Sequence, residues 1–330
     1  MDRNYHVFSD GRIERKDGTV RIVTDGDEKK YVPIENAEAL FMHGQIDFNT
    51  RLMSFLNQEG VAMHVFGWED YYAGSIMPER GQTSGKTVVS QVNAYEDDAH
   101  RRRLAAAIVS GSIHNMRTNA VYYDGRDRDL EVEIADLEAA ADRVADDLPV
   151  DELMGIEATA RKAYYRTFNE ILPGEFRLSR REYNPPPNEV NSLISFGNSL
   201  VYANCVSAIR ATALDPTISY LHEPGERRYS LSLDLADLFK PVLADRVLFR
   251  LVNRGQITHA DFETDLGSCL LTERGRQTYS KAFEETLERT VNHPDLNRKV
   301  SYQYLLRLEA YKLKKHLLTG EPYESFKRWW

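Results

Sequence analysis

The stretch NEVNSLISFGNSLVYANCVSAIRATALDP, residues 188–216, decides what the second half of this chain can fold into. Its apolar residues recur at helical spacing over a length that exceeds an ordinary strand. Asn188 is a good N-cap after three prolines, and Asp215-Pro216 stops the pattern. The stretch therefore predicts a long apolar helix over residues 189–214.

The sequence on both sides of this helix is also helical in character, from Gln91 onward. Apolar residues recur at helical spacing in several further segments, one of which ends at Pro173-Gly174. We predict helices over residues 101–116, 130–147, 154–172, 230–251, 272–291 and 301–318. These segments predict a large C-terminal all-α domain over residues 91–330.

The first 78 residues show the alternating pattern of β-strands instead. Asp10-Gly11 is a tight-turn dipeptide, which predicts a hairpin between strands over residues 5–9 and 12–15. A short helix is expected over residues 48–58, where the alternation breaks. Further strands are expected over residues 20–23, 29–34, 39–42, 62–66 and 71–77.

Residues 79–90 are polar and rich in Gly, Ser and Thr, which indicates a linker. The predicted fold class is therefore α+β. A small N-terminal β-rich domain (residues 1–78) is joined by this short linker to the large C-terminal all-α domain.

Composition narrows the class of protein. The 330 residues include 51 acidic and 42 basic residues, for a formal net charge of −9. This charge excludes a simple polybasic binder of nucleic acids or membranes, although a local basic face remains possible. Cys205 and Cys269 lie far apart, which argues against a disulfide scaffold, a zinc ribbon or an iron–sulfur site.

The first residues carry no apolar signal region. No apolar run approaches the roughly 18 residues that span a bilayer. We therefore expect a cytoplasmic protein.

Two familiar motifs fail on inspection. The stretch from Gly81 to Thr87 is similar to a phosphate-binding P-loop, but Arg80 stands where its first glycine is required. No H-x-x-x-H or H-E-x-x-H pattern occurs, which excludes a zincin. His6, His43 and His64 lie in strand-like stretches, where a packed or surface role is expected.

Two candidate site residues precede and follow the long helix. Glu157 lies near the start of a helix whose neighbouring residues are mostly small and apolar. An acidic residue there could simply complement the helix dipole. His222 follows the stop at Asp215-Pro216 and lies on a loop, where an ordinary loop histidine is the alternative.

Asp234 and Asp237 form a stronger pair. Their spacing places both carboxylates on one helix face, among leucines that should be buried. Buried acids repel each other and lose hydration unless a cation or base compensates. Arg227, Arg228 or Lys240 could supply that compensation, and so could a metal ion.

Together these carboxylates and the imidazole suit a hard divalent cation with open positions for water and phosphate oxygens. Carboxylate oxygens favour Mg²⁺, and a single imidazole tilts the site toward Mn²⁺. Such a site polarises a phosphodiester and activates an attacking hydroxyl.

An ordered set of motifs resembles the first-numbered CRISPR-associated protein family, the integrase-type endonucleases of spacer acquisition. In the helical region the motifs are Glu157, Asn188 to Asn191, Asp215-Pro216, Leu221-His222-Glu223 and Leu233 to Pro241. In the β region they are Val32-Pro33-Ile34, His43-Gly44, Leu52, Leu56, Gly60-Val61, Gly67 and Gly74. No single motif is specific, but the ordered set is.

The resemblance implies an N-terminal β domain, a linker and a helical domain that holds the metal. Glu157, His222 and Asp237 would be the metal ligands, and Asp234 a further acid of the catalytic site. The cofactor would be Mg²⁺ or Mn²⁺. Family members act on DNA, double-stranded and branched, form homodimers and assemble with the small second-numbered CRISPR-associated protein. They insert short foreign DNA segments into the repeat array by 3′-hydroxyl attack on a phosphodiester.

This chain departs from the family pattern in places. Asp237 stands where many relatives carry Glu, and Ala158 and Ser219 replace glycines. Basic side chains near the motifs are expected to contact the DNA backbone. The alternative is that they form a solvated basic face. They are Arg161, Arg177, Arg181, Lys240, Arg246 and Arg250.

Two other functions remain open from the sequence alone: a non-catalytic DNA-organising protein and a metal-dependent hydrolase of small phosphoesters. The aromatic tail, Tyr323, Phe326, Trp329 and Trp330, is expected to dock on its own chain or on a partner.

Overall fold

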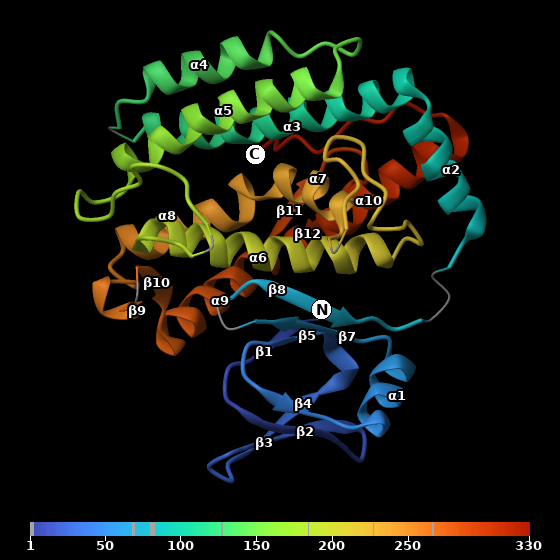
Figure 1. The fold of residues 1–330 in the computed structure, drawn as a ribbon, viewed down its shortest axis with the longest axis vertical. Helices are drawn as coiled ribbons and strands as arrows, with labels where there is room; N and C mark the ends of the chain where they lie inside the picture. Colours follow the sequence, from blue (N-terminus) through green and yellow to red (C-terminus); the bar gives the residue numbers. More distant parts are fainter. Residues whose placement is uncertain are drawn as a thin grey trace.

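The computed structural model describes residues 3–67, 70–79, 83–126, 128–183, 185–226, 228–265 and 267–330. It shows an α+β fold, with a β-rich N-terminal region below a larger helical region (Figure 1). The predicted fold class is confirmed. The Arg80, Gly81 and Gln82 of the P-loop-like stretch, and Arg227, lie outside the described residues.

Two four-stranded sheets make up the N-terminal region. One has the order β1-β5-β7-β8 and the other β4-β3-β2-β6. The strands are β1 (Arg3–Val7), β2 (Gly11–Lys16), β3 (Thr19–Thr24), β4 (Lys29–Pro33), β5 (Ala37–Met42), β6 (Ile46–Asp47), β7 (Ala62–Phe66) and β8 (Tyr72–Ile76). Helix α1 (Thr50–Glu59) begins at the N-cap Asn49 and ends at Gly60, which has a left-handed φ of 77°.

The strands β5 and β7 of the sheet β1-β5-β7-β8 are buried on both faces. Leu40 and Met42 of β5 point into a core shared with the second sheet. The alternate residues Ala39 and Phe41 belong to the core of the helical region. Side chains of a strand alternate between faces, so β5 contributes to two cores, as does β7 through Ala62 and Met63. Figure 1 shows the sheet between α6 and the second sheet.

The hairpin predicted at Asp10-Gly11 is wrong. Strand β1 pairs in parallel with β5, whereas β2 pairs with β3 and β6 in the other sheet. Gly11 has a φ of 146°, and a Cβ there would stand 2.2 Å from the Val23 carbonyl oxygen. Glycine is thus required because β2 and β3 approach closely where the chain passes from one sheet to the other. A two-residue turn is not the reason.

Helix α6 (Glu189–Arg210) crosses the middle of the helical region. By length and composition it could cross a membrane, but 72% of its most apolar stretch is buried, as in the core helix of a folded protein. The other helices are α2 (Gly85–Glu96), α3 (Asp98–Asp124), α4 (Glu131–Ala141), α5 (Val150–Ile171), α7 (Ser230–Phe239), α8 (Arg246–Asn253), α9 (Glu273–Leu287) and α10 (Tyr302–Thr319).

The helices expected over residues 101–116 and 154–172 span Asp98–Asp124 and Val150–Ile171, and other boundaries change as well. Ser84 caps α2 by accepting a hydrogen bond from the Thr87 N–H, so residues 85–90 of the expected linker are helical. The helix expected over residues 230–251 is interrupted at Pro241–Asp245, a π-helical turn closed by the Asp245 N–H on the Lys240 oxygen at 3.0 Å. The helix expected over residues 130–147 stops at Ala141.

The prediction of an all-α C-terminal domain is wrong in one respect, because the region contains two hairpins. Strands β9 (Phe262–Asp265) and β10 (Ser268–Leu271) form one, and β11 (Thr290–His293) and β12 (Arg298–Ser301) form the other. The second hairpin replaces the end of the helix expected over residues 272–291. Each pairs only with itself, so neither adds a layer to the fold.

Polar contacts fix the β-rich region onto the helices. The His6 Nε2 lies 3.0 Å from Glu284 of α9, and the buried His64 contacts Ser207 of α6 at 2.8 Å. Arg276 of α9 pairs with Asp70 at 3.1 Å. His6 and His64 therefore have the packed roles expected for them.

The aromatic tail docks on its own chain. Phe326 stacks on Phe239 of α7 with ring centroids 4.6 Å apart. The Asn115 amide donates to the carbonyls of Phe326 and Leu238, at 3.0 and 2.9 Å. The tail thus supports the end of α7.

Candidate metal and nucleic-acid site

One face of α5 carries the first part of the site. Glu157, Arg161 and Tyr164 follow one another at helical spacing and are buried or nearly so. Glu157 lies in the second turn of α5 and accepts from Arg161, whose Nε is 2.6 Å away. Its partner is therefore a specific guanidinium, and the simple helix-dipole interpretation does not account for it.

Asp234 is the residue that shapes the loop before α7. Its fully buried carboxylate accepts from the backbone N–H groups of Tyr220, Leu221 and His222 at 2.8, 3.1 and 2.9 Å. It also contacts the His222 Nδ1 at 2.8 Å. Both oxygens are engaged, so Asp234 orients the histidine and has little capacity left to bind a metal ion.

Ser219 helps to close the same loop. Its hydroxyl donates to the His222 carbonyl oxygen at 2.5 Å. The serine found in place of the family's glycine therefore has a role in holding the loop.

Asp237 is the centre of the charged group. Its Oδ1 lies 2.7 Å from the Lys240 ammonium and 3.2 Å from the Arg161 guanidinium. Its Oδ2 lies 3.9 Å from the His222 Nε2. Burial alone would raise the pKa of Asp237, but Lys240, Arg161 and His222 outweigh it and hold that pKa well below its usual value.

The pKa of His222 is shifted the other way. Burial would lower it, but the hydrogen bond to Asp234 and the charge of Asp237 outweigh burial and raise the pKa above its usual value. Because Nδ1 faces Asp234, Nε2 is the nitrogen available toward Asp237.

The donor set fits a hard divalent cation, because it combines two carboxylates with one imidazole that a third carboxylate orients. In the part of the chain that the structure describes, no three ligating side chains already surround one point. The Arg161 guanidinium lies between Glu157 and Asp237 instead. Arg161 and Lys240 supply the charge compensation that the sequence had left open.

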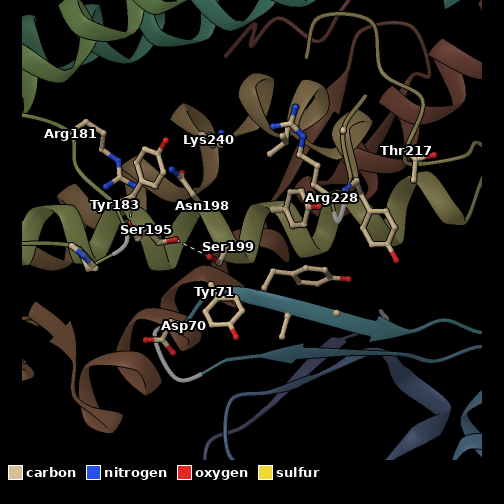
Figure 2. Close-up of a pocket in the computed structure, with 18 residues that line it drawn as sticks. Asp70, Tyr71, Arg181, Tyr183, Ser195, Asn198, Ser199, Thr217, Arg228 and Lys240 are labelled. Atoms are coloured by element: carbon tan, nitrogen blue, oxygen red, sulfur yellow. Dashed lines mark hydrogen bonds between the residues drawn. The ribbon is translucent and has the colours of Figure 1, made fainter. Parts of the chain in front are cut away.

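A large cavity adjoins these charges. It has a volume of about 1080 Å³ and is lined by Lys240, whose ammonium contacts Asp237. Figure 2 shows Arg181, Tyr183 and Lys240 on one side of α6, with Asp70 and Tyr71 on the other. Its aromatic and basic lining residues are Tyr71, Tyr72, Arg181, Tyr183, Tyr202, Arg228, Tyr229 and Lys240.

The tyrosines of this cavity were not predicted from the sequence. They come from β8, α6 and three loops and share no spacing that a single-sequence pattern could reveal. Tyr183 is 75% exposed, and an exposed ring of this size at a cavity edge is a surface on which planar groups stack.

The basic residues predicted to contact DNA do not form one face. Arg161 and Lys240 neutralise acids of the site. Arg181 bonds to Asn191 and Ser195, and Arg250 to the Ala282 carbonyl at 2.8 Å, so both guanidiniums are held within the fold. Of the other two, Arg177 is exposed and Arg246 stacks on Tyr122. The π-helical turn after Lys240 separates Lys240 from Arg246 and Arg250 of α8.

A buried acid stands behind the site. Asp245 accepts from the Tyr164 hydroxyl at 3.0 Å, and burial raises its pKa to about 7. A folded pKa above the unfolded value favours the folded state at low pH, and the advantage is lost as pH rises through about 7.

We therefore expect the free energy of unfolding of the wild type to fall between about pH 4 and pH 7, by at most about 4 kcal/mol from Asp245. Asp245→Asn keeps an acceptor for Tyr164 and cannot ionise, so it should remove this part of the pH dependence. Urea denaturation of both proteins at pH 5 and pH 8 measures the difference. Parallel pH profiles would contradict the assignment.

Comparison with known proteins gives one consistent result. Residues 5–285 match the family model described as "CRISPR associated protein Cas1". The CRISPR-associated endonuclease Cas1 of Haloferax volcanii is 56% identical over 327 residues, which cover 99% of both chains. The structure of a Cas1 protein from Thermotoga maritima has a TM-score of 0.88 at 35% identity, over 98% of this chain and 100% of that one.

Two solved structures at 18% identity share the fold. A casposase bound to integration product has a TM-score of 0.88, over 99% of this chain and 93% of that one. A Cas6-RT-Cas1–Cas2 complex has a TM-score of 0.84, over 100% of this chain and 36% of that one.

Proposed function

This chain belongs to the Cas1 family, and we propose on that basis that it is a metal-dependent DNA endonuclease and integrase of CRISPR adaptation. Its relatives at high identity are named CRISPR-associated endonucleases. The reaction is attack by a DNA 3′ hydroxyl on a phosphodiester, which joins a short foreign segment to the repeat array. Hydrolysis is the same displacement with water as the attacking group.

One observation carries the proposal: the buried Asp237 lies beside His222 and Arg161, and its partner Lys240 lines a large cavity. Carboxylates can bind a cation, and the neighbouring basic side chains can bind a phosphate at the same time.

The residues have distinct roles in this proposal. Glu157, the His222 Nε2 and Asp237 would hold Mg²⁺ or Mn²⁺, which would supply positive charge to stabilise the phosphoryl oxygens and to acidify an attacking hydroxyl. Asp234 fixes the His222 ring through its contact at 2.8 Å. Arg161 and Lys240, once released from the carboxylates, are placed to contact a phosphate.

The cavity would hold the DNA strand that reacts. Its tyrosines offer rings on which unpaired bases stack, and Arg181, Arg228 and Lys240 offer positive charge for the backbone. The shape and charge of the cavity favour a DNA end over a compact phosphoester, which needs a smaller pocket.

The partners proposed are DNA, double-stranded and branched, a second copy of this chain and the small protein Cas2. The fold shared with the casposase and with the Cas1–Cas2 complex supports the first and last of these. A cytoplasmic location is the setting in which the protein would meet the repeat array.

We expect the purified protein to join a short DNA duplex to a supercoiled plasmid in the presence of Mg²⁺ or Mn²⁺, and EDTA to abolish the product. Gel analysis of end-labelled duplex detects the covalent joining. Repeating the assay with and without Cas2 tests whether the partner is required.

The alternatives predict different outcomes of the same assay. DNA binding with no metal-dependent covalent product would favour a DNA-organising protein. Neither binding nor joining, together with hydrolysis of a small phosphodiester, would favour a phosphoester hydrolase. Either result would overturn the proposal.

A further inference from the structure

Three arginines from distant parts of the chain meet around one aromatic ring. The guanidinium carbons of Arg126, Arg246 and Arg328 lie 3.7, 4.6 and 6.0 Å from the centroid of Tyr122. Tyr122 is near the end of α3, Arg246 begins α8, and Arg328 belongs to the tail. We call these four residues the arginine cluster.

The positive charge of the arginine cluster is not neutralised within the described residues. None of the three arginines forms an ion pair there, whereas Arg161, Arg166 and other arginines of the helical region do. Burial, and then Arg246, lower the pKa of Arg328 to about 10, and three tyrosines, Tyr302, Tyr122 and Tyr164, act in the opposite direction. Each of the three is therefore held close to another cation or to a ring rather than to an acid.

Several N–H groups of the arginine cluster are also without acceptors. The Nε and Nη1 of Arg328 and the Nη1 of Arg246 are buried and have no hydrogen-bond partner among the described residues. Only 6% of Arg328 is exposed. Burying guanidinium donors without acceptors is costly, so a buried group of this kind calls for an acceptor that binds to it.

The backbone holds Arg328 in place. Its N–H donates to the Asn115 side chain at 2.7 Å, and its carbonyl oxygen contacts the His114 Nε2 at 3.0 Å. Arg126 is held by donation from Nη1 to the Tyr122 carbonyl oxygen at 3.0 Å. The donors are thus positioned before any ligand arrives, which lowers the entropy lost on binding.

The geometry points to a binding site for a phosphate-type anion at the arginine cluster, filled by a phosphate group of a nucleic acid backbone or by free phosphate. A tetrahedral oxyanion offers acceptors in several directions, and the planar fork of arginine matches a phosphate edge with two parallel bonds. An apolar or cationic ligand would leave the orphaned N–H groups unpaired.

This site is separate from the candidate metal site. It includes none of Glu157, His222 and Asp237, and Arg246 is its one residue that the sequence also predicted to contact the DNA backbone. Asp245, which accepts a hydrogen bond from Tyr164, directly precedes Arg246 in the sequence. The phosphate part of the proposal stands without the nuclease activity, and only its nucleic-acid part rests on the proposed function.

The first experiment measures the melting temperature of the full chain in inorganic phosphate and in sodium chloride at matched ionic strength and pH, with EDTA present. We expect phosphate to raise the melting temperature with saturation, because it binds the folded state only. Arg328→Gln and Arg246→Gln should raise the phosphate concentration for half the effect roughly tenfold, because each removes charged hydrogen bonds.

Two further variants keep the test decisive. Arg126→Gln changes an exposed side chain and should weaken phosphate binding even if Arg328→Gln folds poorly. Arg254→Gln, an exposed arginine that ends α8, is the matched control and should respond to phosphate as the wild type does. If the arginines only stack on Tyr122, the cluster variants will lower the melting temperature equally in both salts, and the proposal fails.

The second experiment separates the two sources of phosphate. Affinity for duplex DNA is measured against salt concentration for the wild type, Arg246→Gln and Arg254→Gln. A shallower salt dependence for Arg246→Gln alone, by roughly one unit of slope, assigns the site to a DNA phosphate. An unchanged slope with phosphate-specific stabilisation assigns it to free phosphate. An unchanged slope without that stabilisation overturns the proposal, whatever the nuclease assay shows.

Discussion

Asp237→Asn should reduce strand transfer and DNA cleavage by at least about a thousandfold, equivalent to roughly 4 kcal/mol in the barrier. The carboxylate is the residue on which His222, Arg161 and Lys240 converge. The amide keeps the shape of the side chain but loses the charge that holds a cation. The measurement is the rate of joining of labelled duplex to plasmid under saturating Mg²⁺ or Mn²⁺.

The fold should survive this change. Removing one partner of a buried ion pair costs on the order of 3 kcal/mol, which is less than the stability of an ordinary folded protein. Asp136→Asn is the matched control, because Asp136 is an exposed acid of α4 that pairs with Arg166, far from the site. It should retain full activity.

His222→Ala should repeat the loss of activity without disturbing the pairs of Asp237 with Lys240 and Arg161. Near-normal strand transfer by either site variant would show that the substituted residue is not required for the reaction.

The second large effect is expected for Asp234→Asn. Its carboxylate accepts four hydrogen bonds, from three backbone N–H groups and from the His222 ring. The side-chain amide of asparagine has only one oxygen to accept these hydrogen bonds. Its NH₂ group would face N–H donors and could not accept a hydrogen bond from them. We expect metal affinity to fall roughly 10- to 100-fold, because the ligand histidine loses the group that orients it. Activity against metal concentration measures the shift, and excess metal should restore part of the rate.

A stability loss alone would not produce that shift. Asp261→Asn is the matched control, because Asp261 is an equally buried acid that accepts from the Thr258 N–H and from Arg274. Both variants should lose stability, and only Asp234→Asn should need more metal. An unchanged metal requirement for Asp234→Asn would reduce its role to folding.

Much of the helical region could be predicted from the sequence, because caps and apolar spacing act locally. Asn188 begins α6 where its side chain accepts from the Asn191 N–H at 3.0 Å, as its position before the apolar pattern indicates. Asp234 and Asp237 share the face of α7 that their spacing of three requires. The contact of His222 with both acids follows from the same loop and helix.

Other features depend on contacts between distant segments, which a single sequence does not encode in any local pattern. The parallel pairing of β1 with β5 overrides the turn signal of Asp10-Gly11. The arginine cluster joins residues from α3, α8 and the tail. Arg161 was expected at the DNA backbone, whereas its fourth-residue spacing from Glu157 on α5 pairs it with that acid.

The sheet β1-β5-β7-β8 has a consequence for how the chain loses its structure. Phe41 and Phe66 lie in the same apolar core as the helices, while Leu40 and Met63 of the same two strands lie in the other core. Neither core can open without uncovering one side of this sheet. The two regions are therefore expected to unfold as one cooperative unit. Cleavage of the chain between β8 and α2 would expose an aromatic, aggregation-prone surface on the N-terminal fragment.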